Sequence, residues 1–102
     1  MAIVAVSIAP VGEGPSVGAW VGAALRVLED QDRVRFEPGP MFTTLEGDLA
    51  EIFALVQRMQ EAVFARGARR VSTVLKVDER RDRPASMDEK LESARRHVAE
   101  AD

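Results

Sequence analysis

Polar side chains with complementary chemistry recur in the predicted strands of this chain. Thr44 and Glu46 are two residues apart, as are Lys76 and Asp78, so each pair projects from one side of an extended strand. Hydroxyl and carboxylate oxygens accept hydrogen bonds, and an ammonium group donates them. Together with Ser7 in the first predicted strand, these groups can hold a small polar molecule. The alternative is that they pair with one another across strands and fix the register of the sheet.

Other kinds of site find little support in the residue types. The chain has no cysteine, which excludes thiolate metal ligands, thiol nucleophiles and disulfides. His97 is the only histidine and has no second metal ligand at a suitable spacing. The arginines of segment 79–83 offer forked donors to a phosphate, but interleaved acids are more typical of a solvated strand end. We find no nucleophile, base and orienting group together, and expect no catalytic residue, metal or cofactor.

Length and composition indicate one globular domain spanning residues 1–102. Apolar residues make up 46% of the chain and charged residues 30%, which is ordinary for a protein with a packed core. The net charge of −3 gives no general attraction to nucleic acid or to an anionic membrane surface. No apolar run approaches the roughly 20 residues that cross a bilayer, and no signal peptide is evident. We therefore expect a cytoplasmic protein without nucleic-acid or membrane partners.

The hydrophobic pattern predicts four strands and three helices. Residues 2–9, 33–37, 42–46 and 70–78 alternate with the two-residue period of strands. Helical spacing follows Ser16, Asp48 and Ser86, each a suitable N-cap, and Gly67 is a natural stop for the second helix. The order strand, helix, strand, strand, helix, strand predicts an α+β, ferredoxin-like βαββαβ sandwich with an additional C-terminal helix. Its four-stranded antiparallel sheet carries both long helices on one face.

This arrangement leaves the second face of the sheet without helices. The residues predicted to face the helices are Val4, Val6, Ile8, Val34, Phe36, Leu45, Leu75 and Val77. The opposite, open face combines the polar residues above with Ile3, Phe42 and Val74, which are too apolar to face water as one patch. We expect a second copy of the chain to cover part of it, with two sheets back to back in a homodimer.

The segment Gly39 to Gly47 contains the pattern Gly-Pro-x-x-Thr-Thr-x-Glu-Gly. With the opening Val4-Ala-Val-Ser-Ile8, Lys76-Val-Asp78 and Met87-Asp-Glu-Lys90, it resembles the thiamine-binding protein family of the YkoF-like superfamily. The resemblance covers nearly the whole chain. It implies a ferredoxin-like fold, dimers that pair into tetramers, and capture of thiamine or its hydroxymethylpyrimidine part near subunit interfaces. It implies no catalytic activity.

By position in that pattern, Thr43, Thr44 and Glu46 are the motif residues, and Phe42 is placed to stack on a flat ring. A carboxylate with a nearby hydroxyl suits the amine and ring nitrogen of an aminopyrimidine. We therefore predict a non-catalytic binding protein that assembles with itself. The predicted ligand-binding residues are Ser7, Phe42, Thr43, Thr44, Glu46, Lys76 and Asp78.

Two alternatives to this function remain open at the level of sequence. One is a dimeric ferredoxin-like enzyme of the monooxygenase or isomerase type that uses the same open-face cleft. The absence of a histidine inside any predicted strand argues against it. The other is a regulatory or structural oligomer whose interface polar groups pair only with each other.

Overall fold

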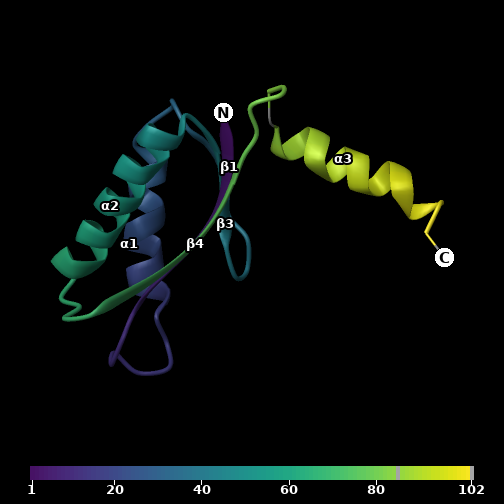
Figure 1. Cartoon of the computed structure of the whole chain (residues 1–102). Coiled ribbons are helices and arrows are strands. Elements are labelled where there is room, and N and C mark those ends of the chain that lie inside the picture. Colours follow the sequence, from purple (N-terminus) through teal and green to yellow (C-terminus); the bar gives the residue numbers. More distant parts are fainter. Residues whose placement is uncertain (85, 102) are drawn as a thin grey trace.

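The computed structural model describes residues 1–84 and 86–101. Within them the sheet has the strand order β2-β3-β1-β4, and each neighbouring pair is antiparallel. This is the predicted ferredoxin-like α+β fold, with two helices on one side of the sheet and the third on the other (Figure 1). The elements are β1 (Ala2–Pro10), α1 (Gly18–Glu29), β2 (Arg35–Glu37), β3 (Thr43–Gly47), α2 (Leu49–Ala65), β4 (Val71–Glu79) and α3 (Met87–Val98).

Two helix starts show how closely local chemistry sets these boundaries. The Asp48 carboxylate accepts a hydrogen bond from the backbone N–H of Glu51 at 3.1 Å, so α2 begins as predicted. The prediction that Ser16 caps α1 is wrong. Its N-cap is Val17, whose carbonyl accepts the first helical hydrogen bonds and whose side chain offers no cap. The helix therefore starts one residue later than a Ser16 cap requires.

The hydrophobic core lies between the sheet and the pair α1 and α2. Alternate residues of β1, beginning with Ala2 and Val4, point into it and are buried. Leu28 of α1, Leu45 of β3 and Ile52 of α2 are each 0% exposed. The strand alternation and the helical stripes predicted from the sequence therefore converge on one packed layer.

One corner of the helix-covered face stays uncovered. Leu75 and Val77 of β4 pair with Val6 and Val4 of β1 and so lie on the predicted side of the sheet. They are nevertheless 37% and 41% exposed. α2 starts beside the end of β3 and reaches β4 near its beginning, where Gln60 contacts Thr73. The second half of β4 therefore has no helix above it.

The third helix stands on the opposite side of the sheet, so the prediction that this face carries no helix is wrong. α3 touches the sheet with its first turns and then extends away from it (Figure 1). Met87 is buried at the root, whereas Leu91 is 57% and Val98 69% exposed. None of the helices in the described part of the chain combines the length and apolar character that crossing a membrane requires.

Candidate functional site

A cleft of about 290 Å³ lies between the open face of the sheet and α3. Its floor is apolar because the small side chain of Ala5 and the larger Ile3 face it from β1. Polar groups stand around that floor on three strands and on the helix. The residues lining the cleft are Ile3, Ala5, Glu37, Thr44, Lys76, Asp78, Met87, Lys90 and Leu91.

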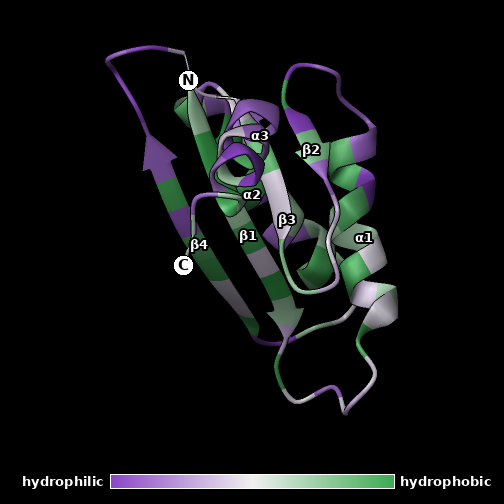
Figure 2. Ribbon diagram, turned by 90° about the vertical axis from the view of Figure 1, so that its right-hand side faces the viewer, coloured by the Kyte–Doolittle hydropathy of each residue, from purple (hydrophilic) through white to green (hydrophobic). Residues whose placement is uncertain are grey.

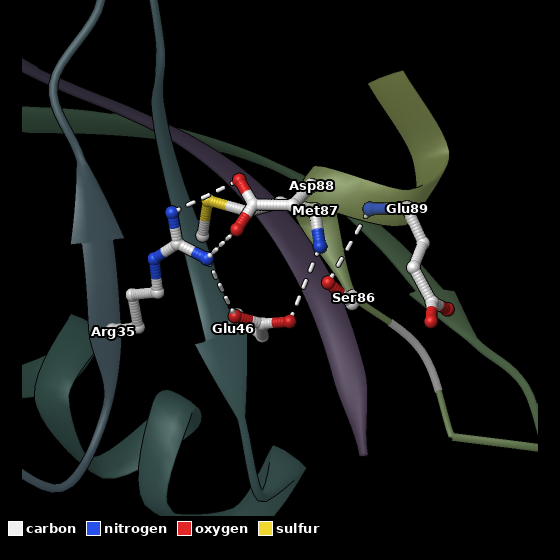
Figure 3. Close-up of polar contacts among 6 residues, drawn as sticks. All are labelled: Arg35, Glu46, Ser86, Met87, Asp88 and Glu89. Atoms are coloured by element: carbon white, nitrogen blue, oxygen red, sulfur yellow. Dashed lines mark hydrogen bonds and ion pairs between the residues drawn. The ribbon is translucent and has the colours of Figure 1, made fainter. Parts of the chain in front are cut away.

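The root of α3 is fixed on the sheet by its own N-terminal hydrogen-bond donors. Ser86 is the N-cap, as predicted, and its hydroxyl accepts from the backbone N–H of Glu89 at 3.4 Å. The N–H of Met87 points instead to the sheet, where it donates to Oε1 of Glu46 at 3.1 Å (Figure 3). A carboxylate is well suited to this place, since the first turn of a helix presents unpaired N–H groups and a partial positive charge. The Met87 side chain is buried beside this contact.

An arginine of β2 completes this attachment. The Arg35 guanidinium donates to both carboxylate oxygens of Asp88, at 2.7 and 3.1 Å, and lies 3.6 Å from Oε2 of Glu46 (Figure 3). The hydrogen bond from Arg35 lowers the pKa of the Asp88 carboxyl. The same bond raises the pKa of Arg35. Arg35 therefore connects the edge strand β2, the carboxylate of β3 and the first turn of α3.

A second ion pair attaches α3 to the other edge of the sheet. The Lys90 ammonium donates to Asp78 of β4 at 2.5 Å. This hydrogen bond lowers the pKa of the Asp78 carboxyl, and the positive charge of Lys90 adds to the effect. α3 is thus bound to β2 and β3 on one side and to β4 on the other, so its first two turns bridge the open face.

Five of the seven predicted site residues share the open face of the sheet, but only three of them line the cleft. Thr44, Lys76 and Asp78 line the cleft together. Glu46 lies beside it on the same face of β3, with its oxygens already engaged by Met87 and Arg35. Ser7 shares the open face but is one cross-strand pair farther along, because Ala5 is opposite Thr44 and Lys76 while Ser7 is opposite Val74.

The remaining two predicted residues lie outside the cleft lining. Thr43 is 9% exposed and points to the helix-covered side, since neighbouring residues of a strand face opposite ways. Phe42 precedes β3 and is 38% exposed. Gly39, the first residue of the motif, lies where an added Cβ would come within 2.6 Å of the Phe42 carbonyl oxygen. The motif thus contains residues that shape a loop and pack in the core as well as residues that line the cleft.

Sequence reasoning missed the part of the cleft that α3 supplies. Met87, Lys90 and Leu91 line it, and none of them is among the predicted binding residues. The sequence of this helix has a narrow apolar stripe of Met87, Leu91, Ala94 and Val98. The signal that could have found them is the weakness of that stripe: a helix with so narrow an apolar face covers a sheet only at one end. Glu37 of β2 also lines the cleft and is not among the predicted binding residues.

The arrangement suits a small molecule with both a flat apolar part and polar edges. Lys76 and Lys90 are donors, Asp78 and Glu37 are acceptors, and Thr44 can act as either. In residues 1–84 and 86–101, no group of three histidines, cysteines or carboxylates is placed to hold a metal ion. The cleft therefore offers recognition by hydrogen bonds and charge over an apolar floor.

Comparison with known proteins gives a consistent result. Residues 4–95 match the family model described as thiamine-binding protein. The chain is 38% identical to the UPF0045 protein YqgV of Bacillus subtilis, over 96% of this chain and 98% of that protein. It is 43% identical to a UPF0045 protein of Mycobacterium tuberculosis, over 94% and 93% of the two chains. A crystal structure of a hypothetical protein from Methanocaldococcus jannaschii matches with a TM-score of 0.84 and 35% identity, covering 91% of this chain and 94% of that one.

Proposed function

The chain belongs to the thiamine-binding protein family, and from this premise we propose that it binds thiamine or its hydroxymethylpyrimidine part without transforming it. The proposed location is the cleft beneath α3. The observation that carries the proposal is that Thr44, Lys76 and Asp78 meet there over an apolar floor. These three residues are the polar contacts that we propose.

The size of the cleft favours the smaller part of such a ligand. Pockets that enclose drug-sized molecules span roughly 300–1,000 Å³, and this one measures about 290 Å³. An aminopyrimidine ring presents an amine donor beside a ring-nitrogen acceptor. The hydroxyl of Thr44 and the carboxylate of Asp78, on the two strands that flank β1, match that pair, and the apolar floor accepts the flat face of the ring.

The structure suggests a changed role for Glu46. Because its two oxygens already serve the N–H of Met87 and the guanidinium of Arg35, Glu46 is better placed to position α3 than to touch the ligand. We therefore propose Glu46 as a positioning residue whose loss opens the cleft by releasing the helix.

We further propose that the chain assembles with itself as a homodimer, and as a dimer of dimers, with the cleft near a subunit interface. The supporting observation is exposed apolar surface on both sides of the sheet. Val74 on the open face is 53% exposed, and Leu75 and Val77 on the other face are also exposed. Monomers seldom leave such surface unpaired along one strand.

Calorimetric titration with thiamine and with hydroxymethylpyrimidine, carried into the millimolar range, tests the binding proposal. Thr44→Val removes the hydroxyl at nearly constant volume and should weaken binding about tenfold, the cost of leaving one ligand polar group unpaired. Thr43→Val is the matched control, since this side chain points away from the cleft, and it should bind as the parent does. No heat with either ligand would refute the proposal, and equal losses in both variants would refute this location.

A further inference from the structure

The strand β4 is a free edge of the sheet. Its nine residues pair with β1 on one side, and no described strand pairs with the other side. Figure 2, viewed from the α3 side, shows β4 at the border of the sheet with apolar and polar bands along it. A long exposed edge with apolar side chains on both faces pairs readily with another strand, and natural proteins usually shorten, charge or cover such edges.

Apolar side chains of α2 extend this edge on the helix-covered side. Phe53 and Phe64 are 45% and 40% exposed. They share a helical flank with Gln60, because their spacings of seven and four residues bring them to the same side. The contact of Gln60 with Thr73 shows that this flank faces β4. A strand added to β4 would therefore have the aromatic flank of α2 beside it.

We propose that β4 pairs with β4 of a second copy, antiparallel and about a two-fold axis at Val74, to form one eight-stranded sheet. In this register Val74 lies opposite its own copy and Thr73 lies opposite Leu75. Val71 lies opposite Val77, so an apolar row continues across the helix-covered side. The inference specifies one interface of the self-association proposed above and does not depend on the ligand.

The charged residues at the ends of β4 favour this register over the neighbouring registers. Arg69 and Arg70 directly precede β4. If the pairing about Val74 extends to them, Arg70 lies opposite Asp78 and Arg69 opposite Glu79, and each symmetric pairing brings two arginines to two acids. Among the described residues, no acid forms an ion pair with either arginine within 4.0 Å. Both therefore have their guanidinium groups available for a partner.

The neighbouring registers bring like charges together. An axis at residue 73 places Arg70 opposite Lys76, an axis at 75 places Arg70 opposite Arg80, and an axis at 76 places Lys76 opposite its own copy. Larger shifts shorten the paired segment. The symmetric register at Val74 is thus the one that is long, apolar along the helix-covered side and electrically complementary.

With this pairing, residues of the second copy would lie at the rim of the cleft. Arg70 of the second copy would lie beside Asp78, which lines the cleft and pairs with Lys90 within its own chain. Ser72 of the second copy would lie opposite Lys76, another cleft residue. A substitution at the interface would therefore alter the surroundings of Asp78 and Lys76, the acceptor and the donor that we propose for the ligand.

Single cysteines test the register directly, since the chain has no cysteine of its own. Directly opposed residues of an antiparallel pair have Cβ atoms about 4.5–5.5 Å apart, within reach of a disulfide after small adjustment. Val74→Cys should form a disulfide-linked dimer under mild oxidation. Ser72→Cys and Lys76→Cys, on the same face, should each remain unlinked alone and should link when the two variants are mixed. Linkage of Ser72→Cys to itself as readily as Val74→Cys would overturn the register.

A charge exchange provides an independent test outside the cleft. Arg69→Glu should weaken dimerisation measured by sedimentation, with a rise in the dimer dissociation constant of about tenfold or less. Adding Glu79→Arg in the same chain should restore it, because the pair between chains is then reversed rather than lost. Glu79→Arg alone is the control, since it also removes the ion pair of Glu79 with Arg81 at 2.8 Å. Circular dichroism confirms that each variant is folded. Failure of the second change to restore the dimer would overturn the pairing.

The outcomes separate this inference from the proposed function. A dimer by sedimentation that Val74→Cys does not link would overturn the β4 interface and leave self-association and ligand binding standing. A linked dimer that gives no heat with thiamine or hydroxymethylpyrimidine would support the interface and refute the ligand. A monomer at every concentration tested would overturn both the interface and the self-association.

Discussion

The two sides of the sheet are built in different ways. On one side, α1 and α2 pack against β1 and β3 through side chains such as Leu28 and Ile52, which are 0% exposed. On the other, α3 is attached mainly by the Arg35–Asp88 and Lys90–Asp78 ion pairs and by one buried side chain, Met87. The stabilisation from apolar packing grows with the buried area and is hard to undo locally, whereas a few polar contacts can open without unfolding the domain. The candidate cleft lies on the side that can open.

The largest difference between the sides should come from Leu45→Ala. This side chain is 0% exposed in β3, and its truncation leaves a cavity in the shared core. The free energy of unfolding, measured by urea denaturation, should fall by about 2–5 kcal/mol. Leu91→Ala on α3 is the matched control, since that leucine is 57% exposed and should leave the value nearly unchanged. Similar losses in the two variants would mean that α3 is part of the cooperative core.

Met87→Ala should have a large effect confined to α3. Burying this side chain stabilises the docked helix by roughly 1.5–3 kcal/mol. Its loss should remove hydrogen-exchange protection from α3 and weaken ligand binding, while β1 and α2 keep their protection. If exchange rises equally throughout the sheet, the two sides are not independent.

The helix caps provide the most closely matched comparison. Asp48 and Ser86 each accept from the backbone N–H three residues later, one on each side of the sheet. Replacing either by alanine should cost about 1 kcal/mol. For Asp48→Ala the loss should appear in global unfolding by urea, whereas for Ser86→Ala it should appear only as faster exchange in α3. A global loss for both caps would contradict the proposed division.

The smallest effect, a partial release of α3 from the sheet, is expected on lowering the pH. Docking of α3 lowers the pKa of Asp78 and of Asp88 below their ordinary value of 3.8, through hydrogen bonds from Lys90 and Arg35. A carboxyl whose pKa is lowered in the docked state favours docking above its ordinary pKa and loses that contribution as pH falls through the lowered value. Amide chemical shifts of α3 should therefore move toward undocked values below pH 3.8, before those of α2. Both pairs are exposed, so the effect is modest and should shrink in high salt.

Much of the fold could be predicted because it depends on local patterns. Alternation located β1 and β4, and the Asp48 and Ser86 caps located the starts of α2 and α3. The exposure of Leu75 and Val77 could not be predicted, because it depends on where α2 crosses the sheet. Alternation assigns a face to a residue but does not say what covers it.

The candidate site was predictable only in part, for a similar reason. Alternation places Thr44 of β3 and Lys76 and Asp78 of β4 on the same face of the sheet, so the three were predicted together. The position of α3, and with it Lys90, depends on a few long-range polar contacts that no periodicity encodes. Thr43 was placed in the site through its motif, although its position next to Thr44 turns it toward the core.

The length of α3 has a practical consequence for detecting ligands. Twelve helical residues span about 18 Å, and they are fixed at one end only. A rotation of about 10° at the root would therefore move the far end by about 3 Å, even if atoms in the cleft shift far less. A spin label or fluorophore at Val98, which is 69% exposed, would report occupancy of the cleft from a distance without touching it.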